Sequence, residues 1–355
     1  MTTFVHTSDW HIGGSSALKE EALPRQLQVL DAIADTALAR GIEVVVMAGD
    51  VFDVDTPTEV EQMALLERVL AYDRAGLRLL CIRGNHDHGS MGDGGRTAIR
   101  YLAHMSDHGV FRGSVFAERT QYVRHGDTVF VLLCHRPRYF HEDSLAALTA
   151  LRSSSLVVDC RHVVMVCHEG IRGSITDTNY RMASGADVPV MSTGETVPDY
   201  DVTYWAIGDI HQKQRVAPRA WYCGAPLQIH FGDAHPKGVL VVDTDNPDAP
   251  EFVPIESKRL VRVHIQDAEN VVIPENAHVK TVGTLKSFNE ARERGLITDA
   301  VVKFEVVKED VIIEYQKSLG LRERVTTGVQ QLLEGEDLEL GLRELSAVFS
   351  AAGVS

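Results

Sequence analysis

Five short polar clusters contain the side chains of this sequence that could bind metal ions. They combine aspartate, histidine and asparagine at close spacing: Asp9 and His11, Asp50 and Asp53, Asn85 and His86, His168, and Asp209 and His211. Carboxylate oxygens and imidazole nitrogens suit divalent cations, and the scattered cysteines show no Cys-x-x-Cys spacing that would indicate a thiolate site. Each cluster alone is weak evidence, whereas the whole set predicts a pair of divalent cations.

A pair of cations would give these residue types a definite chemistry. Two metals roughly 3.5–4 Å apart need one bridging carboxylate and open positions for water and a phosphate group. Their charge lowers the pKa of a bound water, so that a nucleophile for phosphorus forms near neutral pH. A nearby imidazolium can then donate a proton to the leaving oxygen, and His86 is the candidate for this role. The clusters therefore predict phosphoester hydrolysis.

The elements that would position the first three clusters alternate between strand and helix. Apolar runs predict strands, and amphipathic stretches between them predict helices: Phe4–Ser8, Leu23–Ala39, Glu43–Ala48, Thr58–Tyr72 and Leu77–Ile82. A βαβαβ order implies a parallel sheet with right-handed crossovers. Ligands of such sheets bind at the carboxyl ends of the strands, where these polar clusters lie.

The remaining chain is expected to contain more strands and then to change character. Further strands are predicted at Val129–Cys134, Val163–Cys167, Thr203–Ile207, Trp221–Cys223 and Gly238–Val242, with His168 and Asp209 directly after two of them. Strands at Leu260–Ile265 and Ala300–Val307 flank a predicted helix near 285–294. The leucine- and glutamate-rich remainder predicts helices. We therefore expect a main domain at 1–256, a small α/β domain at 257–308 and a helical tail at 309–355.

Composition limits the classes of function. The net charge of −15 argues against nucleic-acid binding by bulk electrostatics, so any DNA contact must be local, metal-assisted or shared with a partner. No apolar run approaches the roughly 18 residues that span a bilayer, and no basic leader precedes the first strand. We expect a cytoplasmic protein with no membrane association and with reduced cysteines.

The ordered clusters resemble a known superfamily. D-x-H, G-D-x-x-D, G-N-H-D, a lone histidine and G-x-x-H are together similar to the calcineurin-like metallophosphoesterases, over roughly Thr2 to Asp243. Other segments carry no generic metal chemistry but resemble the SbcD family of DNA-repair nuclease subunits: His6–His11, Gly49–Asp53, Tyr204–His211, Tyr222–Gln228, Phe231–Asp233 and Lys237–Gly238.

The resemblance implies a fold and a role for each site residue. The fold would be α/β: a four-layer sandwich of two mixed β-sheets flanked by helices, followed by the small α/β capping domain and C-terminal helices. One metal would be held by Asp9, His11, Asp50 and His211, and the other by Asp50, Asn85, His168 and Asp209. His86 would contact the scissile phosphate, and Asp53 would orient it and raise its pKa.

The implied function is a metal-dependent DNA exo- and endonuclease that acts in repair and recombination. Mn²⁺ is the expected metal, with Mg²⁺ as the alternative, and the implied partners are DNA, an SbcC-type ATPase and a second copy of the chain. If the source is a bacterium or phage, we expect the protein to associate with the nucleoid. The tail at 309–355 would bind the ATPase or close the protein's own core, and its amphipathic pattern fits both roles.

One position departs from the family pattern. Relatives usually have histidine where this sequence has Asp209, and aspartate adds negative charge and has a shorter reach. Asp209 would ligate a metal directly or through water, or else mark a weakened second site. Two other functions therefore stay open: a phosphodiesterase for small nucleotides, and a catalytically weak scaffold that binds DNA ends.

Overall fold

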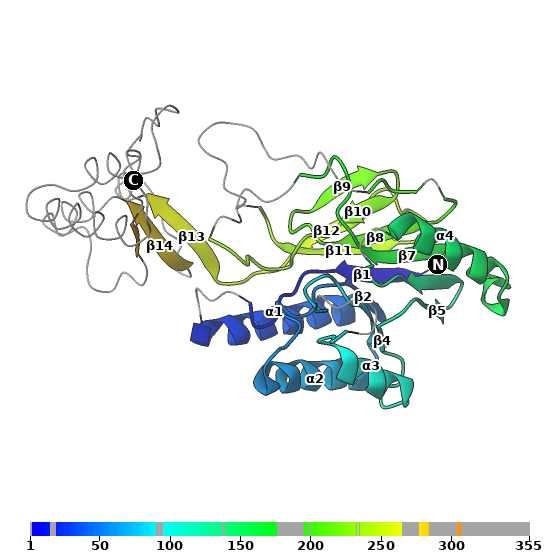
Figure 1. The fold of residues 1–355 in the computed structure, drawn as a ribbon, viewed down its shortest axis with the longest axis horizontal. Coiled ribbons are helices and arrows are strands. Elements are labelled where there is room, and N and C mark those ends of the chain that lie inside the picture. Colours follow the sequence, from blue (N-terminus) through cyan, green and yellow to red (C-terminus); the bar gives the residue numbers. More distant parts are fainter. Residues whose placement is uncertain are drawn as a thin grey trace, which may run out of the picture. The chain divides into compact units, whose positions relative to one another are not determined.

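A computed structural model describes most of the first three quarters of the chain (Figure 1). The described residues are 2–14, 19–89, 95–136, 139–175, 195–198, 200–231, 233, 235–264, 277–283 and 304–306. They belong to two compact units, the first of which extends to Val261, while the second begins at Arg262. The site residues named above all lie in the first unit.

The first sheet has six strands in the order β12-β11-β1-β2-β3-β4. Its parallel strands are β1 (Thr3–Thr7), β2 (Val44–Ala48), β3 (Arg78–Ile82) and β4 (Val115–Ala117). On the other side of β1, β11 (Gly238–Asp243) and β12 (Glu251–Pro254) pair in antiparallel fashion. Every residue of β2 is buried, as expected for a strand whose two faces are both covered.

The second sheet also has six strands, in the order β5-β6-β7-β8-β10-β9. Strands β6 (Thr128–Leu132), β7 (His162–His168), β8 (Tyr204–Gly208) and β10 (Ala220–Tyr222) run parallel. The edge strands β5 (Gln121–His125) and β9 (Gln214–Ala217) are antiparallel to their neighbours. Both sheets are therefore mixed.

Helices cover the outer faces of the two sheets. Figure 1 shows α1 (Lys19–Ala39), α2 (Glu59–Arg74) and α3 (Arg100–Asp107) on the side of the first sheet and α4 (Phe140–Arg152) on the side of the second. A 3₁₀ turn, η2 (Ser155–Val157), follows α4. Helix α2 begins at a capping box in which Thr58 accepts from the Glu61 amide and Glu61 from the Thr58 amide, which fixes its start.

The alternating residues of β2 show how the core is divided. Val44, Val46 and Ala48 belong to the core between the sheets, whereas Val45 and Met47 pack toward the helices of the first sheet. In the inner core the Phe4 ring meets Phe130 edge to face, with 5.3 Å between ring centroids. Replacing such a buried phenylalanine with alanine costs about 3–5 kcal/mol of folding free energy.

The predicted sandwich of two mixed sheets covered by helices is confirmed. The sequence did not predict β4, β5, α3 or α4, because these short or half-buried segments have weak periodicity. A third sheet contains β13 (Arg259–His264), β14 (Ala277–Gly283) and β15 (Phe304–Val306). The predicted helix at 285–294 and the tail at 309–355 lie outside the described residues, and the three domain boundaries stay predictions.

No helix among the described residues is both long and apolar enough to cross a membrane.

Candidate metal centre

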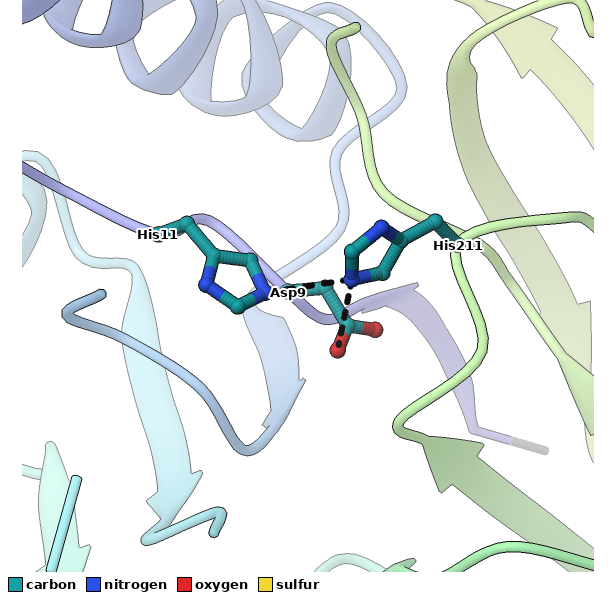
Figure 2. A group of neighbouring side chains, drawn as sticks. All are labelled: Asp9, His11 and His211. Carbon is teal, nitrogen blue, oxygen red and sulfur yellow. Dashed lines mark hydrogen bonds and ion pairs between the residues drawn. The ribbon is translucent and has the colours of Figure 1, made fainter. Parts of the chain in front are cut away.

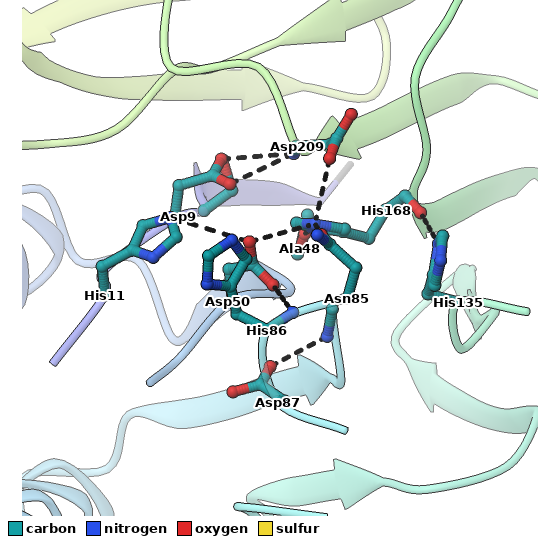
Figure 3. A network of polar contacts seen from close by, with 12 residues as sticks. Asp9, His11, Ala48, Asp50, Asn85, His86, Asp87, His135, His168 and Asp209 are labelled. Carbon is teal, nitrogen blue, oxygen red and sulfur yellow. Dashed lines mark hydrogen bonds and ion pairs between the residues drawn. The ribbon is translucent and has the colours of Figure 1, made fainter. Parts of the chain in front are cut away.

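The five polar clusters meet at one place, between the carboxyl ends of strands from both sheets (Figure 3). Strands β1, β2 and β3 of the first sheet lead into the first three clusters, and β7 and β8 of the second lead into the last two. The structure thus brings together residues as far apart in sequence as Asp9 and Asp209, whose backbone N–H donates to Asp9 Oδ1 over 3.2 Å.

The backbone at the strand ends takes an uncommon conformation. Asp9, His11, Asp50 and Asp209 have φ values of 54°, 45°, 57° and 102°. Residues with a side chain rarely adopt positive φ, and such residues cluster at functional sites. Here the conformation turns the chain sharply after each strand, so that the side chains point back toward the gap between the sheets.

The loops after β1, β2 and β3 are tied to one another. The Asp9 N–H donates to Gly49 O over 3.0 Å, and the His11 N–H donates to Asp50 O over 3.1 Å. The buried Asp87 carboxylate accepts from the backbone N–H groups of Val51, Phe52 and Gly84 over 2.8–3.2 Å. Asp87 therefore fixes two loops of the site, a role that the sequence analysis did not assign.

Asp9, His11 and His211 form the first group of side chains, shown in Figure 2. The Nε2 atoms of His11 and His211 lie 3.2 Å apart. Asp9 Oδ1 lies 4.0 Å from His211 Nε2, and Asp50 Oδ2 lies 3.6 Å from His11 Nε2. These nitrogen and oxygen atoms converge on a common point.

The second group surrounds His168, and Asp50 belongs to it as well. His168 Nε2 lies 2.7 Å from Asn85 Oδ1, 3.3 Å from Asp50 Oδ2 and 3.7 Å from Asp209 Oδ1. Asp50 Oδ2 thus lies between the two groups, within 3.6 Å of a histidine from each. This is the position of a bridging carboxylate in a two-metal site.

Hydrogen bonds orient the two buried imidazoles. His168 Nδ1 donates to Ala48 O over 2.8 Å, and His11 Nδ1 donates to Asp53 Oδ1 over 3.0 Å. When the Nδ1 atom donates in this way, the neutral ring carries its lone pair on Nε2, which faces the centre of the site. Both histidines are therefore oriented as metal ligands.

The electrostatics of the site require positive charge. Asp9 and Asp50 are almost completely buried, and burial together with the Asp50 charge raises the pKa of Asp9 to about 6. Burial alone would lower the pKa of His168, but the charge of Asp50 and its hydrogen bond raise it well above its usual value. Buried carboxylates need a cationic partner, and the donor set fits divalent cations in that role.

His86 lies at the open side of the site, and 43% of its side chain is exposed. Its backbone N–H donates to Asp50 Oδ1 over 2.9 Å, and its Nδ1 donates to the backbone oxygen of Asp53 over 2.7 Å. The Asp53 carboxylate lies 3.9 Å from His86 Nδ1 but 3.0 Å from His11 Nδ1. Asp53 therefore contacts His86 mainly through its main chain, and its carboxylate contacts mainly His11.

The sequence analysis assigned no role to one histidine beside the second group. His135 Nδ1 donates to His168 O over 2.7 Å and lies 3.6 Å from Glu169 Oε2. The His88 ring stacks on the His135 ring, with 5.7 Å between centroids. His135 follows β6, which neighbours β7, and this position after a buried strand was the only available signal.

Comparison with known proteins identifies the class. Residues 2–213 match the calcineurin-like phosphoesterase family, and the chain belongs to this family. Family membership and the clustered histidine and aspartate side chains identify it as a metal-dependent phosphoesterase, a hydrolase.

Individual relatives are distant. One of the two components of the nuclease SbcCD from Escherichia coli strain K12, SbcD, is 22% identical over 255 residues, which cover 64% of this chain and 61% of that protein. Among solved structures, an archaeal phosphodiesterase is 10% identical with a TM-score of 0.34, covering 72% of this chain and all of its own. A purple acid phosphatase from yellow lupin (Lupinus luteus) seeds is 16% identical with a TM-score of 0.38, covering 72% of this chain and 46% of its own.

Proposed function

We propose that this protein hydrolyses phosphodiester bonds in DNA as a metal-dependent exo- and endonuclease, in repair and recombination, as the nuclease subunit of an SbcCD-like complex. The observation that carries the chemistry is the position of Asp50 Oδ2 between two groups of ligand atoms. The choice of DNA is supported by the similarity to E. coli SbcD and by the sequence segments that resemble SbcD nucleases outside the metal ligands.

Two divalent cations would occupy this site, with Mn²⁺ expected first and Mg²⁺ second. Asp9, His11, Asp50 and His211 would hold one, and Asp50, Asn85, His168 and Asp209 would hold the other. When bound, such a pair neutralises charge on the phosphate oxygens and acidifies a water molecule. The oxygen-rich second group suits the hard cations Mn²⁺ and Mg²⁺.

The chain's own contribution to the reaction would come from His86. Its Nδ1 atom is occupied by the Asp53 carbonyl, so Nε2 is the atom that remains for substrate. An exposed imidazole beside a phosphate can hydrogen bond its oxygen and, when protonated, donate to the leaving group. The Asp50 contact to the His86 N–H would keep this imidazole at a fixed place relative to the metals.

The same proposal includes the partners. The net charge of −15 does not favour DNA binding by this chain alone, so a positively charged partner surface would share the contact. An SbcC-type ATPase is the proposed partner, bound through residues 309–355, and a second copy of the chain would complete the assembly. Residues 257–308 are proposed to contact DNA.

The decisive experiment is hydrolysis of end-labelled linear duplex and single-stranded DNA in Mn²⁺, beside bis-p-nitrophenyl phosphate. Asp50→Asn and His86→Gln serve as variants, because both replacements keep the size of the side chain. DNA cleavage that is lost in both variants is the expected result. Cleavage of the small ester alone would overturn the DNA assignment in favour of a small-substrate phosphodiesterase, and inactivity of the folded protein on every substrate would favour a scaffold.

A further inference from the structure

The backbone carbonyl of His211 is held by two donors from a distant part of the chain. Lys237 Nζ donates to His211 O over 3.1 Å, and the Ala225 N–H donates to the same oxygen over 3.2 Å. Only 5% of the Lys237 side chain is exposed, which is unusual for lysine unless its charge is paired. The contact therefore fixes the main chain of one of the proposed metal ligands.

Asp233 pairs with this buried lysine. Its Oδ2 atom lies 3.6 Å from Lys237 Nζ and also accepts from the Ile229 N–H over 2.8 Å and the His230 N–H over 3.3 Å. The Asp233 carboxylate is buried as well, so the two charges depend on each other. Asp233 thus holds Lys237 in place to reach His211.

Gly224 shows how closely the neighbouring segment follows His211. Its φ is +76°, and a Cβ atom at this position would lie 2.7 Å from His211 O and 2.7 Å from the Lys213 N atom. No real Cβ approaches a backbone atom so closely, so the turn requires glycine. The segment containing Gly224 and Ala225 therefore packs directly against the His211 main chain.

Gln228 extends the network to strand β13. Its side-chain amide donates to Asp233 O, and its Oε1 atom accepts from the Leu260 N–H over 2.8 Å. Arg25 of α1 donates to Gln228 O over 2.8 Å. A continuous set of buried polar contacts therefore runs from Leu260, one residue before the end of the first compact unit, to His211.

We propose that Lys237, held by Asp233, is a positioning residue that sets the place of His211 in the first ligand group. This inference rests on the proposed function, in which His211 binds a metal ion. It assigns a role to sequence segments that contain no metal ligand: Tyr222–Gln228, Asp233 and Lys237 form the wall against which the His211 loop is fixed. Without Lys237, the His211 carbonyl keeps one anchor of two, and the imidazole can move away from the His11 Nε2 atom.

The test is two-site Mn²⁺ binding to the full chain, measured by isothermal titration calorimetry. Lys237→Met is compared with the wild type, with His211→Ala, and with Lys213→Met as the matched control. Lys213 is exposed and lies over the Phe252 ring, so its replacement makes the same change of charge away from the His211 carbonyl. We expect Lys237→Met to weaken one Mn²⁺ site about 10–100-fold, as loss of a ligand's supporting contact does, and to leave the other unchanged.

Hydrolysis of bis-p-nitrophenyl phosphate provides a second readout. In Lys237→Met the activity should be restored by high Mn²⁺, whereas a general loss of structure would lower it at every Mn²⁺ concentration. If Lys237→Met does not fold, Lys237→Arg, which keeps the charge but moves the donor atoms, is judged by the same criteria.

The failures are distinguishable. Normal binding in Lys237→Met with a lost site in His211→Ala would overturn this inference alone, as would equal weakening of both sites in Lys237→Met. Normal binding in His211→Ala would overturn the ligand assignment of the proposed function, and this inference with it.

Discussion

The two ligand groups of the site differ in chemistry although they share Asp50. The first offers two imidazole nitrogens, from His11 and His211, with one carboxylate of its own. The second offers one imidazole, from His168, with an amide oxygen and the carboxylate of Asp209. Nitrogen-rich sites favour transition metals, whereas oxygen-rich sites accept Mg²⁺ as readily as Mn²⁺. The comparison teaches that the two positions should differ in metal preference.

The groups also differ in what holds their histidines. His11 is oriented by a side-chain carboxylate, that of Asp53, while His168 is oriented by a backbone carbonyl, that of Ala48. Substitution can remove the first contact but not the second. The first group should therefore be the more sensitive of the two to changes in its surroundings.

Loss of the shared carboxylate should have the largest effect. Asp50→Asn keeps the shape of the side chain, and asparagine tolerates the positive φ of this position. Even a supporting contact is worth about 10–100-fold in metal affinity, so loss of a shared ligand should lower activity by more than about 100-fold and weaken both Mn²⁺ sites. Calorimetric titration checks this; weakening of a single site would show that Asp50 does not bridge the groups.

An intermediate effect is expected from Asp53→Asn, which acts on the first group alone. The variant removes the carboxylate that accepts from His11 Nδ1, so one Mn²⁺ site should weaken about 10-fold while the other stays unchanged. Electron paramagnetic resonance of bound Mn²⁺ can count the occupied sites. Asp55→Asn is the matched control nearby, and an equal loss in that variant would contradict a specific role for Asp53.

The smallest effect is expected at the position that departs from the family pattern. Asp209→His replaces a carboxylate with an imidazole beside His168, so it should raise the preference of the second group for Mn²⁺ over Mg²⁺ by a few-fold, on the order of a factor of 5. The ratio of activities in the two metals measures this. An unchanged ratio would mean that the Asp209 side chain does not reach the metal.

The sequence predicted which clusters meet, because parallel strands end at the same edge and each cluster directly follows a buried strand. It did not predict the partner of the Asp53 carboxylate, because that depends on rotamers: the same loop brings Asp53 near both His11 and His86. The role of Lys237 was also hidden, since its contact is with a backbone atom 26 positions away and leaves no pattern of spacing. Local patterns thus locate the ligands, whereas the contacts that orient them are non-local.

The position of β1 inside its sheet has a consequence for biosynthesis. β1 pairs with β2 through Phe4 and Val44, and on its other side with β11 through Phe4 and Val242. A chain emerging from the ribosome can join β1 to β2 early, but the second edge of β1 stays unpaired until residues 238–243 appear. An apolar strand with an open edge is a template for wrong pairing, so nascent chains stopped before β11 should be prone to aggregation and dependent on chaperones.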